Sequence, residues 1–397
     1  MDLKIIDADN HYYEPADAFT RYAGSRMVHE QFVRWLTEAD GKRKRLLFGD
    51  QMVSMIANPT FERLAQPGAF HDRLKHLERG ERDAGSIYGD LGPMRPEYRD
   101  RAARVRVMDD QGVETAILFP TLALVVEGHV REAEMLHQCL HAFNEWLDDD
   151  WGFARDARII APPHLSMTDV DRAVVELDWV LERGAKVISI RPGPVDGRSP
   201  ADPHFDPFWA RINEAGVIVA YHALGGPSAY SEGFAQLWGR QPLTHPNHLD
   251  ILEFALVGLE RPALDTMLAL TLHNLFGRFP NIRVASIEMG SAWVPYLLHL
   301  LDHAGGLVLR RVDTFGGVLT DRPSDIFKDR VWISPFPEED MTTLAAAVGA
   351  DHIVMGSDWP HPEGVRAPVD FLDCLAGFSE ADVRRVVRDN ALELVRL

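Results

Sequence analysis

The sequence predicts an α/β protein built as a (β/α)8 barrel, the TIM-barrel fold. Eight short apolar segments recur along the 397 residues, and stretches with helical periodicity separate them. Most of these segments are apolar on both faces, which is typical of parallel strands covered by helices. Eight strands alternating with helices is the count of this barrel. The alternative is an open doubly wound sheet, which usually carries a glycine-rich fingerprint after its first strand, where this chain has DADNHYYEP.

The elements follow one another in barrel order. Several of the expected helices end in a glycine directly before the next strand, as a helix stop should. Helices are expected over residues 101–112, 130–150, 167–184, 206–216 and 341–350. Strands are expected over residues 3–9, 113–120, 158–162, 186–191, 217–222, 283–288, 330–334 and 352–358.

Two segments are longer than the loops of a barrel require. Residues 20–100 form an expected insertion after the first strand, with an apparent hairpin at KRLLFGDQMVSMI. Residues 223–248 are rich in glycine, proline and aromatic residues and are expected to form a lid-like loop after the fifth strand. Long excursions of this kind build substrate walls in barrels. The chain is therefore predicted to be one domain, 1–397, with two insertions.

Composition excludes several classes of partner. The chain has 41 basic and 60 acidic residues, a net charge of −19, and such a surface repels nucleic acid and anionic lipid. No long apolar stretch precedes the first acid, so neither a signal peptide nor a membrane span is expected at the N-terminus. The two cysteines, Cys139 and Cys374, are expected to be reduced, as in a cytoplasmic protein.

Polar residues gather at the expected strand ends, where barrel enzymes place their functional groups. Asp9 and His11 follow the first strand, and because they are two apart they point to the same face. His222 and Asp358 end the fifth and eighth strands. Two imidazoles and two carboxylates suit Zn²⁺, Mn²⁺ or Fe²⁺ better than a thiolate site would. The other polar strand ends are His164, Arg191, Glu288 and Ser334.

Each of these residues also has a structural interpretation. Asp9 and His11 could cap a helix and bond a loop, and His222 could be a hydrogen-bonded core histidine. Arg191 could belong to a structural ion pair. Asp358 could cap the turn that follows it. Glu14 and His361 could equally be surface residues.

The pair Asp9-x-His11, His222 after the fifth strand, GSDWPHP at 356–362 and FGRFPNIRVASIEMG at 276–290 together resemble the amidohydrolase superfamily. The likeness is greatest to the branch containing aminocarboxymuconate semialdehyde decarboxylase and metal-dependent benzoate-type decarboxylases. The resemblance implies that Asp9, His11, His222 and Asp358 bind the metal. It also implies that Arg191 faces a substrate carboxylate.

The resemblance has one departure and leaves the reaction open. Glu288 stands where the family usually has a catalytic histidine, so Glu288, with Asp358 and His361, is the expected acid–base set. Glu14 is expected to line the pocket with Arg191. Non-oxidative loss of CO₂ from a small cyclic or aromatic carboxylic acid is the leading prediction. Hydrolysis of an amide, ester or lactone is the alternative, because the same ligands could activate water. A third possibility is a non-catalytic binding scaffold.

The expected cofactor is one divalent metal per subunit, zinc first, with manganese or iron as alternatives. The expected partner is a small carboxylated molecule. A homo-oligomer, most simply a dimer, is also expected, because large apolar residues on barrel excursions need covering. Packing of the two insertions against each other would cover them equally well. These residues are Trp35, Phe48, Phe61, Phe70 and Trp238.

Overall fold

The fold is described from a computed structural model of the 397-residue chain. The described residues are 3–38, 41, 43–53, 56, 58–70, 73, 90–223, 233, 236–239, 260–308 and 316–396. Most of the expected lid-like loop, 223–248, lies outside them.

Parallel strands form the centre of the molecule, in two sheets. The first has the order β1-β7-β8 and the second β13-β12-β11-β10-β9. The structure thus gives two sheets where one continuous eight-stranded sheet was predicted. The strands are β1 (Ile5–His11), β7 (Val113–Phe119), β8 (Ile159–Ile160), β9 (His164–Leu165), β10 (Val187–Ile190), β11 (Ile218–His222), β12 (Val284–Ile287) and β13 (Val331–Ile333).

The third and eighth expected strands explain the difference. Two short strands stand in place of the third: β8 lies within the expected range 158–162 and pairs with β7, whereas β9 lies just beyond that range and pairs with β10. The eighth is not a strand, but single parallel bridges join Ile353 to Ile333 of β13 and Trp359 to Asn10 of β1. Ala8 N also donates to Met355 O at 2.8 Å. Backbone contacts therefore run from β13 through residues 353–359 to β1.

The strands enclose an apolar interior, which explains why they are hydrophobic on both faces. Ile6, Ile117, Val187 and Ile218 belong to one inner cluster, while a larger cluster lies between strands and helices. The short helix α16 (Asn390–Val395) packs against the inner cluster with three of its residues, Ala391, Leu394 and Val395.

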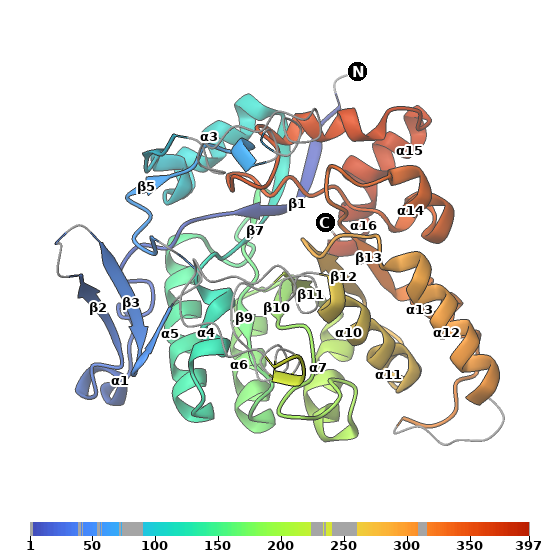
Figure 1. The fold of residues 1–397 in the computed structure, drawn as a ribbon, viewed down its shortest axis with the longest axis horizontal. Helices are drawn as coiled ribbons and strands as arrows, with labels where there is room; N and C mark the ends of the chain where they lie inside the picture. The colour runs from blue at the N-terminus through green and yellow to red at the C-terminus, as the bar shows by residue number, and fades with distance from the viewer. Residues whose placement is uncertain are drawn as a thin grey trace.

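Helices lie around the outside of the strands (Figure 1). The five that were expected are α3 (Arg101–Gln111), α5 (Ala133–Asp150), α6 (Val170–Glu182), α7 (Asp206–Ala215) and α14 (Met341–Val348). Gly112 and Gly216 end α3 and α7 in the left-handed conformation, at φ 71° and 66°. The others are α1 (Ser25–His29), α4 (Ala123–His129), α10 (Glu260–Leu272), α11 (Leu275–Arg278), α12 (Val294–Val308), α13 (Pro323–Arg330) and α15 (Glu380–Arg384).

The segment between β1 and β7 carries an antiparallel sheet of its own. The strands β2 (Val33–Thr37), β3 (Lys44–Phe48) and β4 (Gln51–Met52) pair in this order, and the predicted hairpin is the β3–β4 pair. β2 and β3 extend away from the helices at the left of Figure 1. β5 (Arg63–Leu64) pairs with β6 (Gly92–Pro93).

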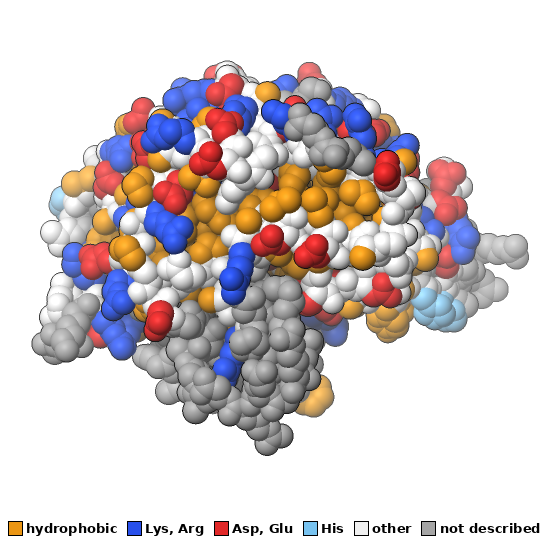
Figure 2. All heavy atoms as spheres, turned by 90° about the horizontal axis from the view of Figure 1, so that it is seen from above, with side chains coloured by type: hydrophobic (Ala, Val, Ile, Leu, Met, Phe, Trp, Pro, Cys, Tyr) orange, Lys and Arg blue, Asp and Glu red, His pale blue; other side chains and the backbone are white. Residues whose placement is uncertain are grey.

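The dimer was predicted from large apolar residues on the insertions, and the structure shows how exposed several of them are. Phe48 and Phe61 are buried within the chain, where their rings pack against Phe19 and Tyr13. They therefore need no second subunit, whereas Trp238 is 60% exposed. Figure 2 shows a band of hydrophobic side chains across the upper face, with charged side chains on both sides of it.

None of the described helices is long and apolar enough to cross a membrane. Cys139 is buried, Cys374 is half-buried, and neither forms a disulfide.

Candidate metal centre

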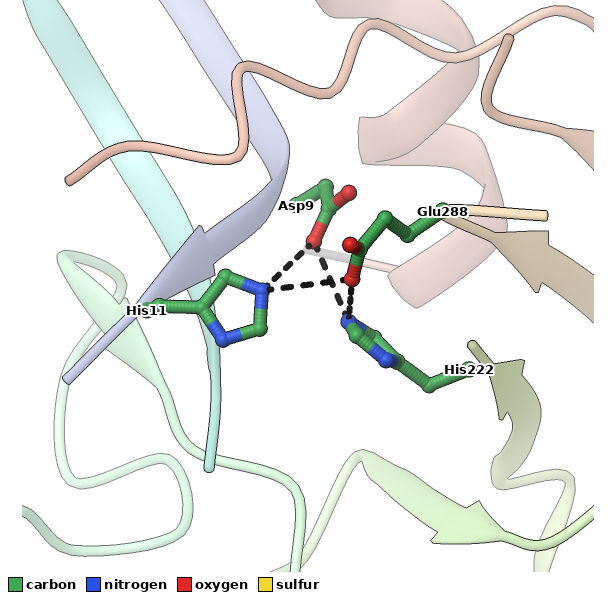
Figure 3. A group of neighbouring side chains, drawn as sticks. All are labelled: Asp9, His11, His222 and Glu288. Atoms are coloured by element: carbon green, nitrogen blue, oxygen red, sulfur yellow. Dashed lines mark ion pairs between the residues drawn. The ribbon is translucent and has the colours of Figure 1, made fainter. Parts of the chain in front are cut away.

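Side chains from three strand ends converge at one point (Figure 3). Asp9 and His11 come from β1, His222 is the last residue of β11, and Glu288 directly follows β12. A register shift between Asp7 and Asn10 in the β1–β7 pairing precedes His11. The ligand atoms of these four residues all lie within 4.8 Å of one another. The predicted trio of Asp9, His11 and His222 is therefore brought together.

The spacing of these atoms fits a common ion. Asp9 Oδ1 lies 3.3 Å from His11 Nε2 and 3.4 Å from His222 Nε2. Glu288 Oε2 lies 3.3 Å from His222 Nε2 and 3.8 Å from His11 Nε2. Ligands about 2.0–2.2 Å from a tetrahedral metal are separated by about 3.3–3.6 Å. Three of these four distances match the edges of such a coordination shell, and the fourth, from Glu288 to His11, is about 0.2 Å longer than its upper limit.

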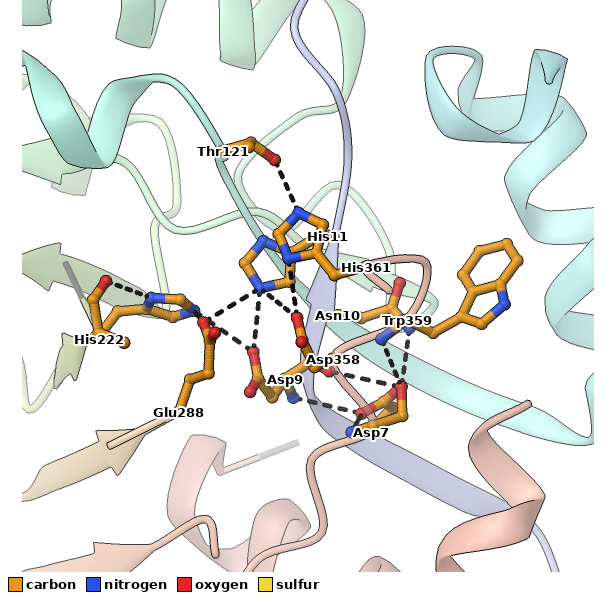
Figure 4. A network of polar contacts seen from close by, with 12 residues as sticks. Asp7, Asp9, Asn10, His11, Thr121, His222, Glu288, Asp358, Trp359 and His361 are labelled. Atoms are coloured by element: carbon orange, nitrogen blue, oxygen red, sulfur yellow. Dashed lines mark hydrogen bonds and ion pairs between the residues drawn. The ribbon is translucent and has the colours of Figure 1, made fainter. Parts of the chain in front are cut away.

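Asp358, the fourth predicted ligand, faces the same nitrogen of His11 as Asp9 and Glu288 do (Figure 4). Its Oδ1 is 3.3 Å from His11 Nε2 and 2.9 Å from His361 Nδ1. The His361 ring stacks on the His11 ring with centroids 3.9 Å apart. His361 Nε2 is 3.0 Å from the hydroxyl of Thr121. Asp358 and Glu288 therefore both border the cluster formed by Asp9, His11 and His222.

Buried polar atoms of this cluster and of Asp358 lack hydrogen-bond partners within the described part of the chain. They are Asp9 Oδ1, both ring nitrogens of His11, His222 Nε2 and both carboxylate oxygens of Asp358. Buried polar groups are normally paired, because an unpaired one costs the free energy of its desolvation. A set of such atoms aimed at one point has the donor chemistry of a cation site, and the residues fit a divalent metal.

The backbone is strained at two residues of the site, Glu288 directly after β12 and Asp358 in the segment 353–359. Glu288 and Asp358 both have φ 53°, which is uncommon for residues other than glycine. Asp358 N donates to Asp9 O at 2.8 Å, which holds this turn against β1. A Cβ on Gly356 would lie 2.5 Å from Asp9 Cβ, so only glycine allows this approach.

Burial and neighbouring charges perturb the titration of the cluster. Burial raises the pKa of Glu288 well above its usual range, and the charge of Asp358 adds to the rise. Burial also raises the pKa of Asp358, and the negative charges of Glu363 and Asp9 add to the rise. Burial lowers the pKa of His11 to about 3, which leaves the neutral imidazole that binds metals. Burial acts to lower the pKa of His222 too, but Asp9 and Glu288 outweigh it and the pKa rises.

Glu14, a predicted pocket residue, is buried against the start of α4. It is 1% exposed, and its Oε1 accepts backbone hydrogen bonds from Thr121, Leu122 and Ala123 at 3.1, 2.7 and 3.1 Å. These amides begin α4, so Glu14 satisfies donors that the helix itself cannot. Burial raises its pKa to about 7. Its other oxygen, Oε2, has no hydrogen-bond partner among the described residues, and contact of Glu14 with substrate stays a prediction.

Arg191 directly follows β10, as predicted, and lines a cavity of about 240 Å³ with Glu127 and Asp196. None of the residues of the metal cluster lines this cavity. The charges of His222 and Arg191 add to the burial that lowers the pKa of His164 to about 3, so both lie within electrostatic reach of His164.

Several polar residues that support the cluster have no signal in the sequence. Asp7 Oδ2 accepts hydrogen bonds from Ser357 Oγ at 2.5 Å and from Asn10 Nδ2 at 2.7 Å. Thr121 donates its hydroxyl to Tyr12 O at 3.0 Å while it contacts His361. Serine and threonine near strand ends are too common to be singled out from one sequence. Only the crowding of acids in DADNHYYEP pointed to this region.

Known proteins resemble the chain along its length. A family model described as Amidohydrolase matches residues 6–397. Gamma-resorcylate decarboxylase from Polaromonas sp. (strain JS666 / ATCC BAA-500) is 24% identical over 326 residues, 76% of this chain and 90% of that protein. The solved structure of an amidohydrolase from Mycobacterium avium subsp. paratuberculosis K-10 is 39% identical, has a TM-score of 0.87 and covers 100% of both chains.

A further solved structure is similar in fold. It is a dihydroxybenzoic acid decarboxylase from Polaromonas sp. JS666 with bound manganese and the inhibitor 2-nitroresorcinol. It is 18% identical, with a TM-score of 0.62, and covers 100% of this chain and 97% of that one.

Parallel strands surrounded by helices, with histidines and carboxylates gathered at the strand ends, define the class of metal-dependent α/β enzymes. Within this class the chain belongs to the amidohydrolase family, whose model matches it from residue 6 to residue 397. The resemblance predicted from the motifs is therefore confirmed, and the protein is an enzyme of this family.

Proposed function

We propose that the protein is a metal-dependent decarboxylase of a small cyclic or aromatic carboxylic acid, built on a (β/α)8 barrel. The observation that carries the proposal is the convergence of Asp9, His11 and His222 on one point, with buried ligand atoms that lack other partners. Asp358 completes the predicted ligand set. One divalent ion bound there would stabilise negative charge on the oxygen atoms of a substrate carboxylate.

Two nitrogens and two carboxylate oxygens are compatible with zinc, manganese or iron. We keep zinc as the first expectation, and the bound manganese of the dihydroxybenzoic acid decarboxylase supports manganese as its main competitor.

We assign to Glu288 the role of the general acid that protonates the carbon from which CO₂ leaves. Burial raises the pKa of Glu288 above its usual range, so the side chain holds a proton that it can give to the carbon that loses CO₂. The carbon–carbon bond breaks, CO₂ leaves, and this proton takes its place on the ring. Asp358 and His361 complete the acid–base set.

The position of His361 supports its part in that set. The Thr121 hydroxyl uses its one hydrogen to donate to Tyr12 O, so it acts as the acceptor in its contact with His361 Nε2. His361 Nε2 is therefore the donor and carries a proton. His361 Nδ1 then faces Asp358 Oδ1 at 2.9 Å. The ring is thus held between a fixed hydroxyl and a predicted ligand.

Hydrolysis of an amide, ester or lactone is the second candidate. It is favoured by the presence of Glu288 where the family usually has histidine, since an ionised Glu288 would serve as a base for water. The similarity to gamma-resorcylate decarboxylase supports decarboxylation, which we therefore propose first.

The test begins with the metal content of the purified protein. The metal-loaded enzyme is then incubated with hydroxylated benzoates and, separately, with aryl esters, anilides and lactones. Release of CO₂ and release of free acid are scored independently. CO₂ release from at least one benzoate, lost on chelation and restored by metal, is expected. Chelator-sensitive hydrolysis without CO₂ release from any acid would favour the second candidate.

A further inference from the structure

Arg104 is a fully buried arginine of α3 that lies behind the metal centre. Its guanidinium donates three hydrogen bonds in different directions. Nε donates to Glu97 O at 2.7 Å, Nη2 donates to His11 O at 2.6 Å, and Nη1 donates to the side-chain oxygen of Asn10. The guanidinium carbon also lies 4.7 Å from the centre of the Trp359 ring. One side chain thus contacts both chain segments that carry predicted ligands.

From Asn10 a series of hydrogen bonds leads to the segment of Asp358, and Figure 4 shows Asn10, Asp7 and Trp359 of this series. Asn10 Nδ2 donates to Asp7 Oδ2 at 2.7 Å. Asp7 accepts from Ser357 N at 2.9 Å and from Ser357 Oγ at 2.5 Å. Ser357 Oγ in turn accepts from Trp359 N at 3.1 Å. This series of hydrogen bonds ties the end of β1 to residues 357–359 without using any ligand atom.

Burial of the Arg104 guanidinium costs free energy, so its hydrogen bonds must compensate for the lost hydration. Within the described residues Arg104 forms no ion pair, and the nearest carboxylate in the series, Asp7, is reached only through Asn10. A buried charge without a direct partner is destabilising unless its hydrogen bonds are satisfied. The planar fork of arginine meets acceptors in three directions, which the single ammonium group of lysine cannot reproduce.

We infer that Arg104 is a positioning residue of the metal centre, which sets the separation between the Asp9–His11 segment and Asp358. It acts through the backbone of His11 and through Asn10, Asp7 and Ser357. This inference rests on the proposed metal site. Residues that orient metal ligands typically change metal affinity about 10–100-fold when they are replaced.

The chain offers a matched control in Arg283. Its guanidinium donates to three backbone carbonyls, those of Glu393, Leu394 and Gly216, at 3.0, 2.6 and 3.2 Å. Arg283 directly precedes β12, whereas Glu288 directly follows it, so the control lies at the opposite end of the same strand. Arg283→Lys therefore removes the same kind of backbone clamp far from the proposed metal.

The experiment compares Arg104→Lys, Arg283→Lys and the unmodified protein. Mn²⁺ affinity is measured by titration followed by electron paramagnetic resonance, and the melting temperature is measured on the metal-free proteins. Both variants are expected to melt at lower temperature. Only Arg104→Lys should bind Mn²⁺ about 10–100-fold more weakly, with an altered spectrum of the bound ion, while Arg283→Lys stays within about twofold of the parent.

Equal Mn²⁺ affinity of the two lysine variants would overturn the inference, because Arg104 would then be merely structural. If Arg104→Lys does not fold, Ser357→Ala provides the second test. It removes the hydroxyl that joins Asp7 to Trp359 N and is expected to weaken Mn²⁺ binding in the same direction, while parent affinity in this variant contradicts the inference. An unmodified protein that binds no Mn²⁺ would instead overturn the proposed metal site itself, and the inference with it.

Discussion

Replacing Glu288 by glutamine separates acid–base chemistry from metal binding. Glutamine keeps the size of the side chain but cannot give or accept a proton. A positioned general acid or base contributes about 10²–10⁴ in rate, which is about 3–5 kcal/mol of activation free energy. We therefore expect kcat of Glu288→Gln, measured at saturating metal, to fall by that factor.

The position of Glu288 requires that metal occupancy be measured in the same experiment. Its Oε2 lies 3.3 Å from His222 Nε2, close enough to serve as a ligand itself. Glu339→Gln is the matched control, because Glu339 accepts from the backbone nitrogens of Ser291 and Ala292 at 2.8 and 2.9 Å and is not part of the cluster. Parent turnover of a fully loaded Glu288→Gln would refute the acid–base role. Loss of metal from this variant alone would show that Glu288 acts as a ligand.

Four further predictions concern other residues and the assembly. His222→Ala should lose tightly held metal while its circular dichroism spectrum stays that of the parent, and retained metal would contradict the ligand assignment. Arg191→Lys keeps the charge but loses the two-pronged carboxylate contact, so a rise in KM is expected, and an unchanged KM would remove Arg191 from the substrate site. Glu14 has a pKa raised from 4.5 to about 7 by burial, so the folded state holds this proton more tightly than the unfolded chain and loses stability as the pH rises through that interval. Glu14→Gln should therefore gain stability relative to the parent between pH 4.5 and 7, by at most about 3 kcal/mol, in denaturant titrations, and a pH-independent difference would count against it. Sedimentation at micromolar concentration should give a dimer, and a single 44.6 kDa species would exclude it.

Much of the fold could be predicted because its signals are local. Helices α3, α5, α6, α7 and α14 follow from apolar periodicity and from glycine stops such as Gly112. The strands followed from short runs of apolar residues. The division of the third strand and the loss of the eighth could not be predicted, since they depend on which neighbour each backbone amide finds. Ala8 N, for example, bonds to Met355 O, nearly the whole chain away.

The residues of the candidate site could be predicted only where the ends of the strands could be predicted. Asp9, His11 and His222 were named because parallel strands bring their carboxyl ends together, and they do converge. The hydrogen bonds of Glu14 to the backbone at the start of α4 could not be predicted, because distance along the sequence from His11 says nothing about burial. Arg104 was not predicted at all, because an arginine within RAARVRVMDDQ has the pattern of an exposed helix face. Only tertiary packing shows that it is fully buried.

The strained residues connect the fold to the chemistry. Glu288 and Asp358 each follow a strand or strand-like segment at φ 53°, a conformation that costs of order 1–3 kcal/mol when the residue is not glycine. Such strain persists only where surrounding contacts impose it. At Asp358 these contacts are visible, since its amide donates to Asp9 O and its carbonyl accepts from His361 N, both at 2.8 Å. The contacts that stabilise this turn thus come from a predicted ligand and from the histidine stacked beside the cluster. The unfavourable backbone conformation thus occurs at the two positions whose carboxylates border the proposed metal. We infer that this conformation is what directs the two side chains toward the metal.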